Sequence, residues 1–369
     1  MKDIKWSYLS KQFSPEATSS ILKELQEFLP TGDLTLGKPV AEFEQRFAEM
    51  IGTKFAIGVN SGTDAIKLSL KALGVGPGDE VITTANTFIA TVGAIGELFA
   101  TPVFVDCTDN FCMDVDQVES AITPKTKAIV PVHYAGQMTD INALKSIADK
   151  YGLPIVEDSC QCILGDIKGV RSGTSGITGA FSLHPLKNLN VWGDGGVIVT
   201  NDDKIYDTLN LLRNHGLRSR DEVEILGCNS RLDSVQAVVG NWLIDQVESI
   251  TDQRIKNAAR LDAGLSKIKN ITIPMRYTDR KLVYHLYIVF AERRDELYDY
   301  CKSNGIPAKI HYPVPVYLQP AVKHLNHQQG DFPVTDHHSA TMISFPAHDH
   351  MTDEELDYII QKVNDFYDD

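Results

Sequence analysis

Short hydrophobic runs alternate with amphipathic stretches from residue 50 to residue 200. Two amphipathic stretches, at residues 62–74 and 140–152, carry apolar residues at helical spacing, and another helical run starts at Phe88. The hydrophobic runs are short and predict strands at residues 54–60, 79–85, 102–107, 127–134 and 153–158. Alternation of strands with helices over this length predicts a mostly parallel sheet covered on both faces. Ligands of such sheets bind beyond the carboxyl ends of the strands.

The pattern changes after residue 230. Helical periodicity continues to Gly264 without a breaker, which predicts one long helix that bridges two domains or two subunits. Further on, the pattern predicts strands at residues 271–275 and 282–290 and helices at residues 293–305 and 353–367. We therefore expect a large domain at residues 1–245, with an N-terminal arm at 1–50, and a small C-terminal α+β domain at 246–369.

Composition and charge narrow the classes of function. The chain has 369 residues, of which 43% are hydrophobic, as expected for an ordinary globular protein of two domains. Its formal net charge of −14 argues against general affinity for nucleic acid or for an anionic membrane surface. No hydrophobic run reaches the length of a membrane span, and the polar start lacks the apolar core of a signal peptide. We expect a cytoplasmic protein.

The cysteines and histidines show no metal-binding pattern. The six cysteines are scattered, and we expect reduced, mostly buried thiols. The eleven histidines also lack ligand spacing, and those of "DHHSA" and "HDHM" are expected in solvated loops. No metal site is predicted.

Lys187 lies in an unusual place for a lysine. It follows a strand-like stretch, Gly179–His184, and precedes a glycine cluster and a second apolar strand, Val197–Thr200. A lysine held where the chain turns into its own interior is either incidental or a nucleophile whose pKa is lowered by burial. The position alone favours the first interpretation, so the decision rests on the other residues.

Two further segments carry candidate chemistry. "NSGTDAI", residues 60–66, follows a strand and opens a helix, where N–H groups and hydroxyls can hold a phosphate or simply cap the helix. Asp158 ends a strongly apolar run, where a carboxylate needs donors or a cation. It could hold a protonated pyridinium nitrogen, or cap a loop. A phosphate cradle, the aromatic Phe88, Asp158 and then Lys187 together form the set that pyridoxal 5′-phosphate requires.

The chain resembles the DegT/DnrJ/EryC1/StrS sugar aminotransferases over nearly its whole length. The resemblance rests on ordered motifs that include "GVNSGTDAI", "GDEVITTANTFIAT", "VPVHYAGQ", "VEDSCQ", "FSLHPLKNLNVWGDGG", "NHGL", "GCNSRLDSVQA" and "HYPVP". It implies an α/β fold of the aspartate-aminotransferase type (fold type I), with a mostly parallel seven-stranded sheet in the large domain and a small C-terminal α+β domain. It also implies a transaminase that uses pyridoxal 5′-phosphate.

The same resemblance implies a role for each site residue. Lys187 would form the Schiff base with the cofactor, and Asp158 would pair with its ring nitrogen. Gln161 would approach the ring hydroxyl and Phe88 would stack on the ring. The phosphate would be held by Gly62, Thr63 and Ser182 of one subunit and by Asn229, placed at the start of the long helix, of the other. The catalytic unit would therefore be a homodimer with shared active sites.

The substrates are less closely defined. The family's sugar dehydratases replace the lysine by histidine, so Lys187 favours transamination, from L-glutamate to a keto or aldehyde sugar of lipopolysaccharide or another cell-surface polysaccharide. Leu183 and His184 stand where aromatic residues are usual, which affects packing or the shape of the substrate site. The specific expectation is formation of 8-amino-3,8-dideoxy-manno-octulosonate. The alternatives are a nucleotide-linked 3-keto-sugar aminotransferase and a non-catalytic regulator that binds pyridoxal phosphate.

Overall fold

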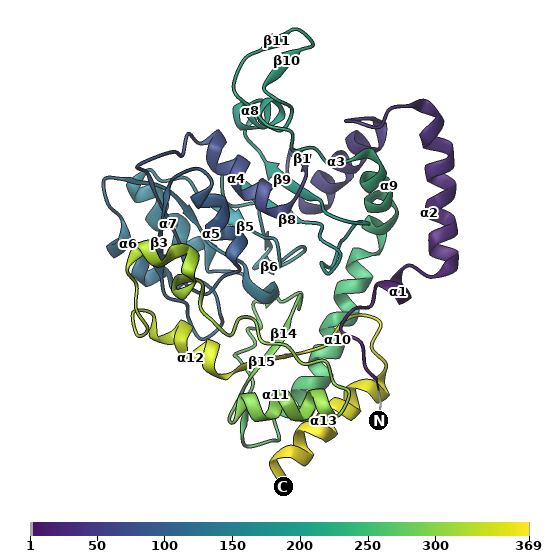
Figure 1. The fold of residues 1–369 in the computed structure, drawn as a ribbon, viewed down its shortest axis with the longest axis vertical. Coiled ribbons are helices and arrows are strands. Elements are labelled where there is room, and N and C mark those ends of the chain that lie inside the picture. The colour runs from purple at the N-terminus through teal and green to yellow at the C-terminus, as the bar shows by residue number, and fades with distance from the viewer. Residues whose placement is uncertain (1–2, 369) are drawn as a thin grey trace.

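A central sheet made of two parts forms the centre of the large domain, with helices around it (Figure 1). The computed structural model describes residues 3–368. The strands are β1 (Phe55–Val59), β2 (Glu80–Thr84), β3 (Thr101–Val105), β4 (Thr126–Val130), β5 (Val156–Asp158), β8 (Thr178–Ser182) and β9 (Gly196–Thr200). A three-stranded part, β3-β2-β4, joins a four-stranded part, β5-β8-β9-β1, through parallel bridges between β4 and β5. β9 is antiparallel to β1 and β8 and the other pairings of these strands are parallel, so the predicted fold is confirmed.

Helices cover both faces of this sheet because its strands are apolar on both sides. The helices are α3 (Lys38–Ile51), α4 (Gly62–Ala72), α5 (Ile89–Gly96), α7 (Ile141–Tyr151), α8 (Asp203–Arg213) and α9 (Ser234–Leu243), with the shorter α6 (Val118–Ala121). Successive residues of β9 separate the two cores: Val197 and Val199 pack with α3, α7 and α9, and Ile198 packs with α4, α5 and α8.

The small domain lies below the sheet in Figure 1, at the lower end of α10 (Val247–Leu265). Its antiparallel sheet has the order β12 (Ile271–Thr272), β14 (Tyr287–Ala291) and β15 (Met342–Phe345). This sheet shares a separate core with α10, α11 (Arg294–Ser303) and α13 (Asp353–Asp368). The boundary near residue 246 stays a prediction, because several segments cross it. Ile4 joins the small-domain core, and residues 316–332 pack back onto the large domain. Val247, Ile250 and Val283 also belong to the large-domain core.

Three short strand pairings and several short helices complete the chain. The remaining elements are β6 (Asp166–Ile167), β7 (Val170–Arg171), β13 (Arg280–Lys281), β10 (Leu217–Ser219), β11 (Glu222–Val223), α1 (Leu9–Gln12), α2 (Pro15–Phe28), α12 (Pro333–Thr341) and six 3₁₀ segments at 29–31, 115–117, 134–136, 244–246, 316–318 and 320–325. The β10–β11 hairpin projects from the large domain, and α2 packs on α9 (Figure 1). None of the helices within residues 3–368 has the length and apolar character needed to cross a bilayer.

Three local predictions were wrong. The long helix is interrupted by a 3₁₀ turn at Ile244–Gln246, although it ends close to the expected position, at Leu265. Asn229 does not start the helix, because α9 begins at Ser234 with Asp233 as its N-cap. The histidines expected in solvated loops include two buried ones, His338 within α12 and His348.

All six cysteines are free, and four of them are buried.

Candidate active site

A cavity of about 480 Å³ opens beyond the carboxyl ends of the sheet strands, where the small domain meets the large one. Seven of the eight expected site residues line it: Gly62, Thr63, Phe88, Asp158, Gln161, Ser182 and Lys187. They come from β5, β8 and the segments after β1, β2, β5 and β8, so the topology of the sheet brings them together. Asn229 is exposed and is not among the lining residues.

The first turn of α4 forms one end of the cavity. Ser61 is the N-cap, and its Oγ accepts a hydrogen bond from the backbone N–H of Asp64 at 3.1 Å. A Cβ on Gly62 would lie 2.7 Å from Cβ of Ser182 and 2.8 Å from Sγ of Cys160, so only glycine allows this close approach. The N–H groups at the helix start and the hydroxyls of Thr63 and Ser182 therefore face a small space suited to a phosphate.

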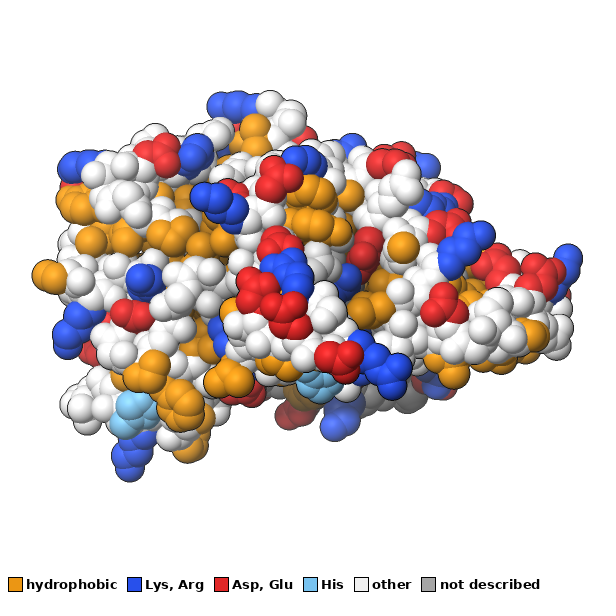
Figure 2. All heavy atoms as spheres, turned by 90° about the horizontal axis from the view of Figure 1, so that it is seen from above, with side chains coloured by type: hydrophobic (Ala, Val, Ile, Leu, Met, Phe, Trp, Pro, Cys, Tyr) orange, Lys and Arg blue, Asp and Glu red, His pale blue; other side chains and the backbone are white. Residues whose placement is uncertain are grey.

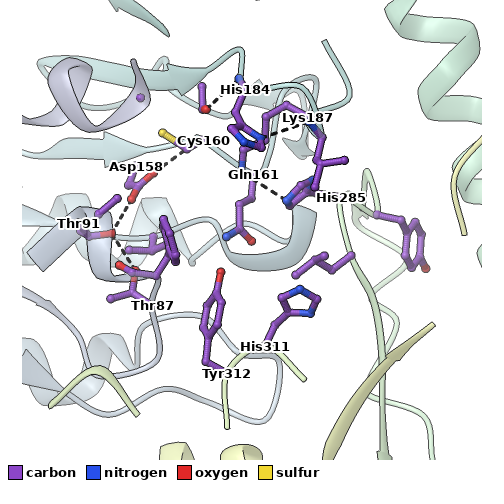
Figure 3. A pocket seen from close by; sticks show the side chains of 18 of the residues that line it. Thr87, Thr91, Asp158, Cys160, Gln161, His184, Lys187, His285, His311 and Tyr312 are labelled. Atoms are coloured by element: carbon purple, nitrogen blue, oxygen red, sulfur yellow. Dashed lines mark hydrogen bonds between the residues drawn. The ribbon is translucent and has the colours of Figure 1, made fainter. Parts of the chain in front are cut away.

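Asp158 is the last residue of β5 and is 5% exposed. Its Oδ2 accepts a hydrogen bond from Oγ1 of Thr91 at 2.8 Å, and its Oδ1 accepts one from the N–H of Cys160 at 3.2 Å (Figure 3). These donors orient the carboxylate and satisfy it in a buried position, where an unpartnered polar group would be costly. A carboxylate at this depth is suited to hold a protonated ring nitrogen.

Lys187 lies in the loop between β8 and β9. Its backbone N–H donates to the carbonyl of His184 at 2.8 Å, and its own carbonyl accepts from the hydroxyl of Tyr8 at 3.1 Å. Its Nζ points into the cavity, 3.3 Å from Nε2 of His285 (Figure 3). Burial lowers the pKa of Lys187 from its ordinary value, and Cys160 and Asp158 oppose that shift only in part. Such an amine is closer to the neutral, nucleophilic form than a surface lysine.

Gln161 and Phe88 both line this cavity. Oε1 of Gln161 accepts a hydrogen bond from the N–H of Ala135 at 2.7 Å, which orients the amide and leaves its NH₂ group as a donor for a ligand. Phe88 is 47% exposed and its ring lies 5.5 Å from the ring of Tyr312, at 33°. The ring of a flat aromatic ligand could stack on Phe88 in this position.

Several cavity residues were not recognised as site residues from the sequence. They are Trp6, Tyr8, Thr91, Arg254, Tyr284, His285, His311, Tyr312 and His348. His311 and Tyr312 belong to the motif "HYPVP", which gave a family signal but no role. Trp6 and Tyr8 lie in the polar N-terminal segment, which carries no local pattern that indicates a site.

These residues fit pyridoxal 5′-phosphate. The space beside Gly62 is closed to a Cβ, the buried carboxylate of Asp158 already has its donors, and the amine of Lys187 faces the same cavity. Phosphate, ring nitrogen and aldehyde would each meet a group of matching chemistry. Among residues 3–368, no group of three or more His, Cys, Asp or Glu side chains is arranged to hold a metal ion.

Comparison with known proteins agrees with this geometry. The chain matches the DegT/DnrJ/EryC1/StrS aminotransferase family over residues 15–364. The chain belongs to this family. It is therefore an aminotransferase that uses pyridoxal 5′-phosphate, and its fold is the fold type I expected from the sequence.

Individual relatives extend the similarity to the whole chain. The dTDP-3-amino-3,4,6-trideoxy-alpha-D-glucose transaminase of Streptomyces venezuelae is 38% identical over 365 residues, which cover 99% of this chain and 95% of the relative. The crystal structure of S. venezuelae DesV in complex with a ketimine intermediate superposes with a TM-score of 0.97 at 36% identity, covering 100% of both chains. A protein named pleiotropic regulatory protein, from Geobacillus stearothermophilus, is 38% identical over 370 residues, which cover 100% of this chain and 98% of the relative.

Proposed function

We propose that this aminotransferase moves the amino group of L-glutamate to the 3-keto group of a nucleotide-linked sugar. The observation that carries the proposal is the amine of Lys187, buried with a lowered pKa in the same cavity as Asp158 and the Gly62 cradle. The nucleotide-linked acceptor is supported by the name of the Streptomyces venezuelae relative, which describes a dTDP-sugar transaminase.

Each side chain then has a defined task. Pyridoxal phosphate, when bound, supplies an electron sink for the carbanion that forms at Cα of the amino acid. Lys187 Nζ takes the proton from that Cα as general base. Asp158 would hold the proton on the ring nitrogen, the NH₂ of Gln161 would donate to the ring hydroxyl, and Phe88 would pack against the ring. Gly62, Thr63 and Ser182 would bind the phosphate.

Two other functions were expected from the sequence, and they differ in the support that the relatives give them. Formation of 8-amino-3,8-dideoxy-manno-octulosonate stays a prediction, and the relatives named above give it no support. The alternative of a non-catalytic regulator is supported by the name of the Geobacillus stearothermophilus relative, pleiotropic regulatory protein. The set of Lys187, Asp158 and Gln161 in one cavity nevertheless favours catalysis, because a sensor needs no base at Cα.

We also propose a homodimer in which Asn229 reaches the phosphate of the partner. Asn229 lies outside its own cavity, on an exposed segment that also carries Val223 and Leu226, the latter 86% exposed. Hydrophobic side chains gather in several places on the face viewed from the hairpin end (Figure 2). A second copy would bury such side chains and add Asn229 to the cradle.

The donor half of the reaction can be tested without knowing the sugar. Purified protein with bound cofactor is mixed with L-glutamate, and the visible absorbance of the cofactor and the release of 2-oxoglutarate are followed. The Lys187→Arg variant is the control and should release none. If wild-type protein also releases none, L-glutamate is the wrong donor.

The acceptor is tested next, with a dTDP-linked 3-keto sugar and a free octose aldehyde assayed side by side. The proposal expects amination of the nucleotide-linked sugar and parallel initial-rate plots, as for a ping-pong reaction. Preference for the octose, or intersecting plots, would contradict it.

A further inference from the structure

Within the described part of the chain, the amine of Lys187 has the imidazole of His285 as a side-chain hydrogen-bond partner. Nζ of Lys187 lies 3.3 Å from Nε2 of His285 (Figure 3). The two residues come from different parts of the chain, Lys187 from the loop between β8 and β9 and His285 from the segment before β14. Both line the cavity. The contact is therefore a product of the tertiary structure and was not visible in the sequence.

The surroundings of His285 keep its ring neutral. Burial lowers the pKa of His285 well below its usual range, and the charges of Lys187 and Arg254 and the rings of His311 and His184 act in the same direction. A neutral imidazole carries one N–H, on Nδ1 or on Nε2. The direction of the hydrogen bond to Lys187 depends on which nitrogen carries it.

The environment of Nδ1 decides between the two tautomers. Nδ1 of His285 is buried and has no hydrogen-bond partner among residues 3–368. A proton on Nδ1 would bury an N–H without an acceptor. Among backbone groups, buried N–H donors without a partner are rarer than under-satisfied carbonyl acceptors, and we apply the same preference to this ring. A proton on Nε2 instead leaves only a lone pair unpartnered on Nδ1 and directs the N–H at Lys187. The Nε2–H tautomer is therefore favoured.

We propose that His285 is a positioning residue that donates its Nε2–H to the neutral amine of Lys187 whenever this lysine is free. The inference deepens the function proposed above by assigning a partner to its base. The bond exists only for the neutral amine, because an ammonium has no lone pair to accept it. His285 therefore acts against the nearby Asp158, which favours the charged form, and holds Nζ in the cavity as a base and nucleophile.

The test measures how Lys187 captures its cofactor. Full-length protein freed of cofactor is mixed with pyridoxal phosphate over a range of pH, and the rise of visible absorbance is timed. Only the neutral amine attacks an aldehyde, so the rate reports the apparent pKa of Lys187. His285→Leu removes the donor and should raise that pKa by about one unit, a tenfold slower rate at pH values below it. His285→Gln retains an N–H donor and should stay close to wild type.

His311→Phe is the matched control. His311 lines the same cavity, but its Nδ1 is 2.9 Å from Oγ of Ser344 and its contact is not with Lys187. Its loss should leave the apparent pKa within a few tenths of a unit. An unchanged or lower pKa in His285→Leu would overturn the proposal.

A second measurement needs no variant. The ¹⁵N resonances of His285 in the wild-type protein report which ring nitrogen carries the proton, and protonation on Nδ1 would also overturn the proposal. The two proposals fail differently. Wild-type protein that takes up the cofactor but ignores glutamate contradicts only the proposed donor, whereas unchanged capture in His285→Leu contradicts only the role of His285.

Discussion

Thr91 donates a 2.8 Å hydrogen bond from its Oγ1 to Oδ2 of Asp158 and so joins α5 to the end of β5 at the floor of the cavity. The hydroxyl of Thr87 lies 2.8 Å from that of Thr91. A hydroxyl has only one proton, and Thr91 uses its own for Asp158, so Thr87 is the donor to Thr91. The two threonines thus form a chain of donors directed at one buried carboxylate.

Replacing Thr91 by valine should remove the hydrogen bond that orients the Asp158 carboxylate, without changing the shape of the site. A hydrogen bond to a charged group contributes about 1.5–3 kcal/mol, so we expect kcat to fall roughly ten- to hundredfold, with little change in KM. Thr91→Ser keeps the hydroxyl and should recover most of the rate. Equal rates for the valine variant and wild type would show that Asp158 does not depend on Thr91.

Asp158→Asn should leave the cofactor bound and cut turnover severely. The amide keeps the volume of the carboxylate but cannot hold a proton on the ring nitrogen, so the carbanion loses its electron sink. Loss of one charged partner in a dry site typically costs on the order of 10² in rate. Cofactor content by absorbance and the rate of 2-oxoglutarate release are measured on the same sample. Near-normal turnover would remove Asp158 from its proposed role.

Gly62→Ala should damage the phosphate cradle through sterics alone. The new Cβ would lie 2.7 Å from Cβ of Ser182 and 2.8 Å from Sγ of Cys160, closer than carbon atoms and sulfur can approach. The start of α4 must therefore move away from β8, and we expect at least tenfold weaker binding of pyridoxal phosphate. Gly76→Ala is the control, because no atom lies within 4 Å of a Cβ placed there. Equal affinities in both variants would contradict the cradle.

The sequence predicted the site residues that lie at strand ends. It missed those that other segments of the chain bring to the site when they pack against the sheet. Asp158 ends an apolar strand and Gly62 follows one, so the period of the pattern together with the known behaviour of parallel sheets placed them on one rim, whereas Ser182 was expected from the family resemblance. His285 reaches Lys187 across 98 residues, and Tyr8 reaches it from the N-terminal segment. No local pattern encodes such contacts, because they arise only when the small domain and the N-terminal segment pack against the sheet.

The erroneous predictions have the same origin. The interruption at Ile244–Gln246 accompanies the burial of Ile244 in the core of the large domain, a contact that helix propensity does not encode. His348 appeared solvated because it lies in a polar stretch, yet the fold buries it beside the ring of Tyr8 at 5.1 Å.

Glu157 should make the stability of the large domain sensitive to acid. Its buried carboxylate accepts hydrogen bonds from Nε2 of His133 at 2.8 Å and from the N–H groups of Gly173, Ser175 and Gly176. Burial would raise the pKa of Glu157, but His133 and the backbone donors outweigh it and hold the pKa below the ordinary 4.5. A carboxylate with a depressed pKa stabilises the folded state above pH 4.5, and this contribution is lost as the pH falls through the lower, folded-state pKa.

Glu157→Gln should therefore lower the free energy of unfolding by about 3–5 kcal/mol at neutral pH, because it leaves buried donors without their charged acceptor. The difference from wild type should narrow below pH 4.5. Denaturant unfolding of both proteins at pH 7 and pH 4 measures it, and a difference that is constant with pH would show that the charge of Glu157 contributes nothing.

The last prediction concerns Asn229 and the proposed dimer. Asn229 is exposed, pairs by a β-bridge with Asn214, and is not the N-cap of α9, because Asp233 occupies that position. A role in helix stability is thereby removed, and Asn229→Asp should leave the unfolding of the chain unchanged. If the amide instead donates to the phosphate of the partner, the substitution sets a carboxylate against a phosphate dianion. Affinity for pyridoxal phosphate should then fall at least tenfold.

Asn214→Asp is the matched control for that experiment. It adds the same charge at the other position of the bridge, where the side-chain oxygen already accepts from Nη1 of Arg231 at 2.8 Å. Cofactor-free protein of each form is titrated with pyridoxal phosphate. The titration is done at protein concentrations above and below the dissociation constant of the dimer. A loss of affinity confined to Asn229→Asp and to the dimeric sample supports a shared site. Equal affinities for Asn229→Asp and wild type would remove Asn229 from the cradle, and with it the reason to place the phosphate between two subunits.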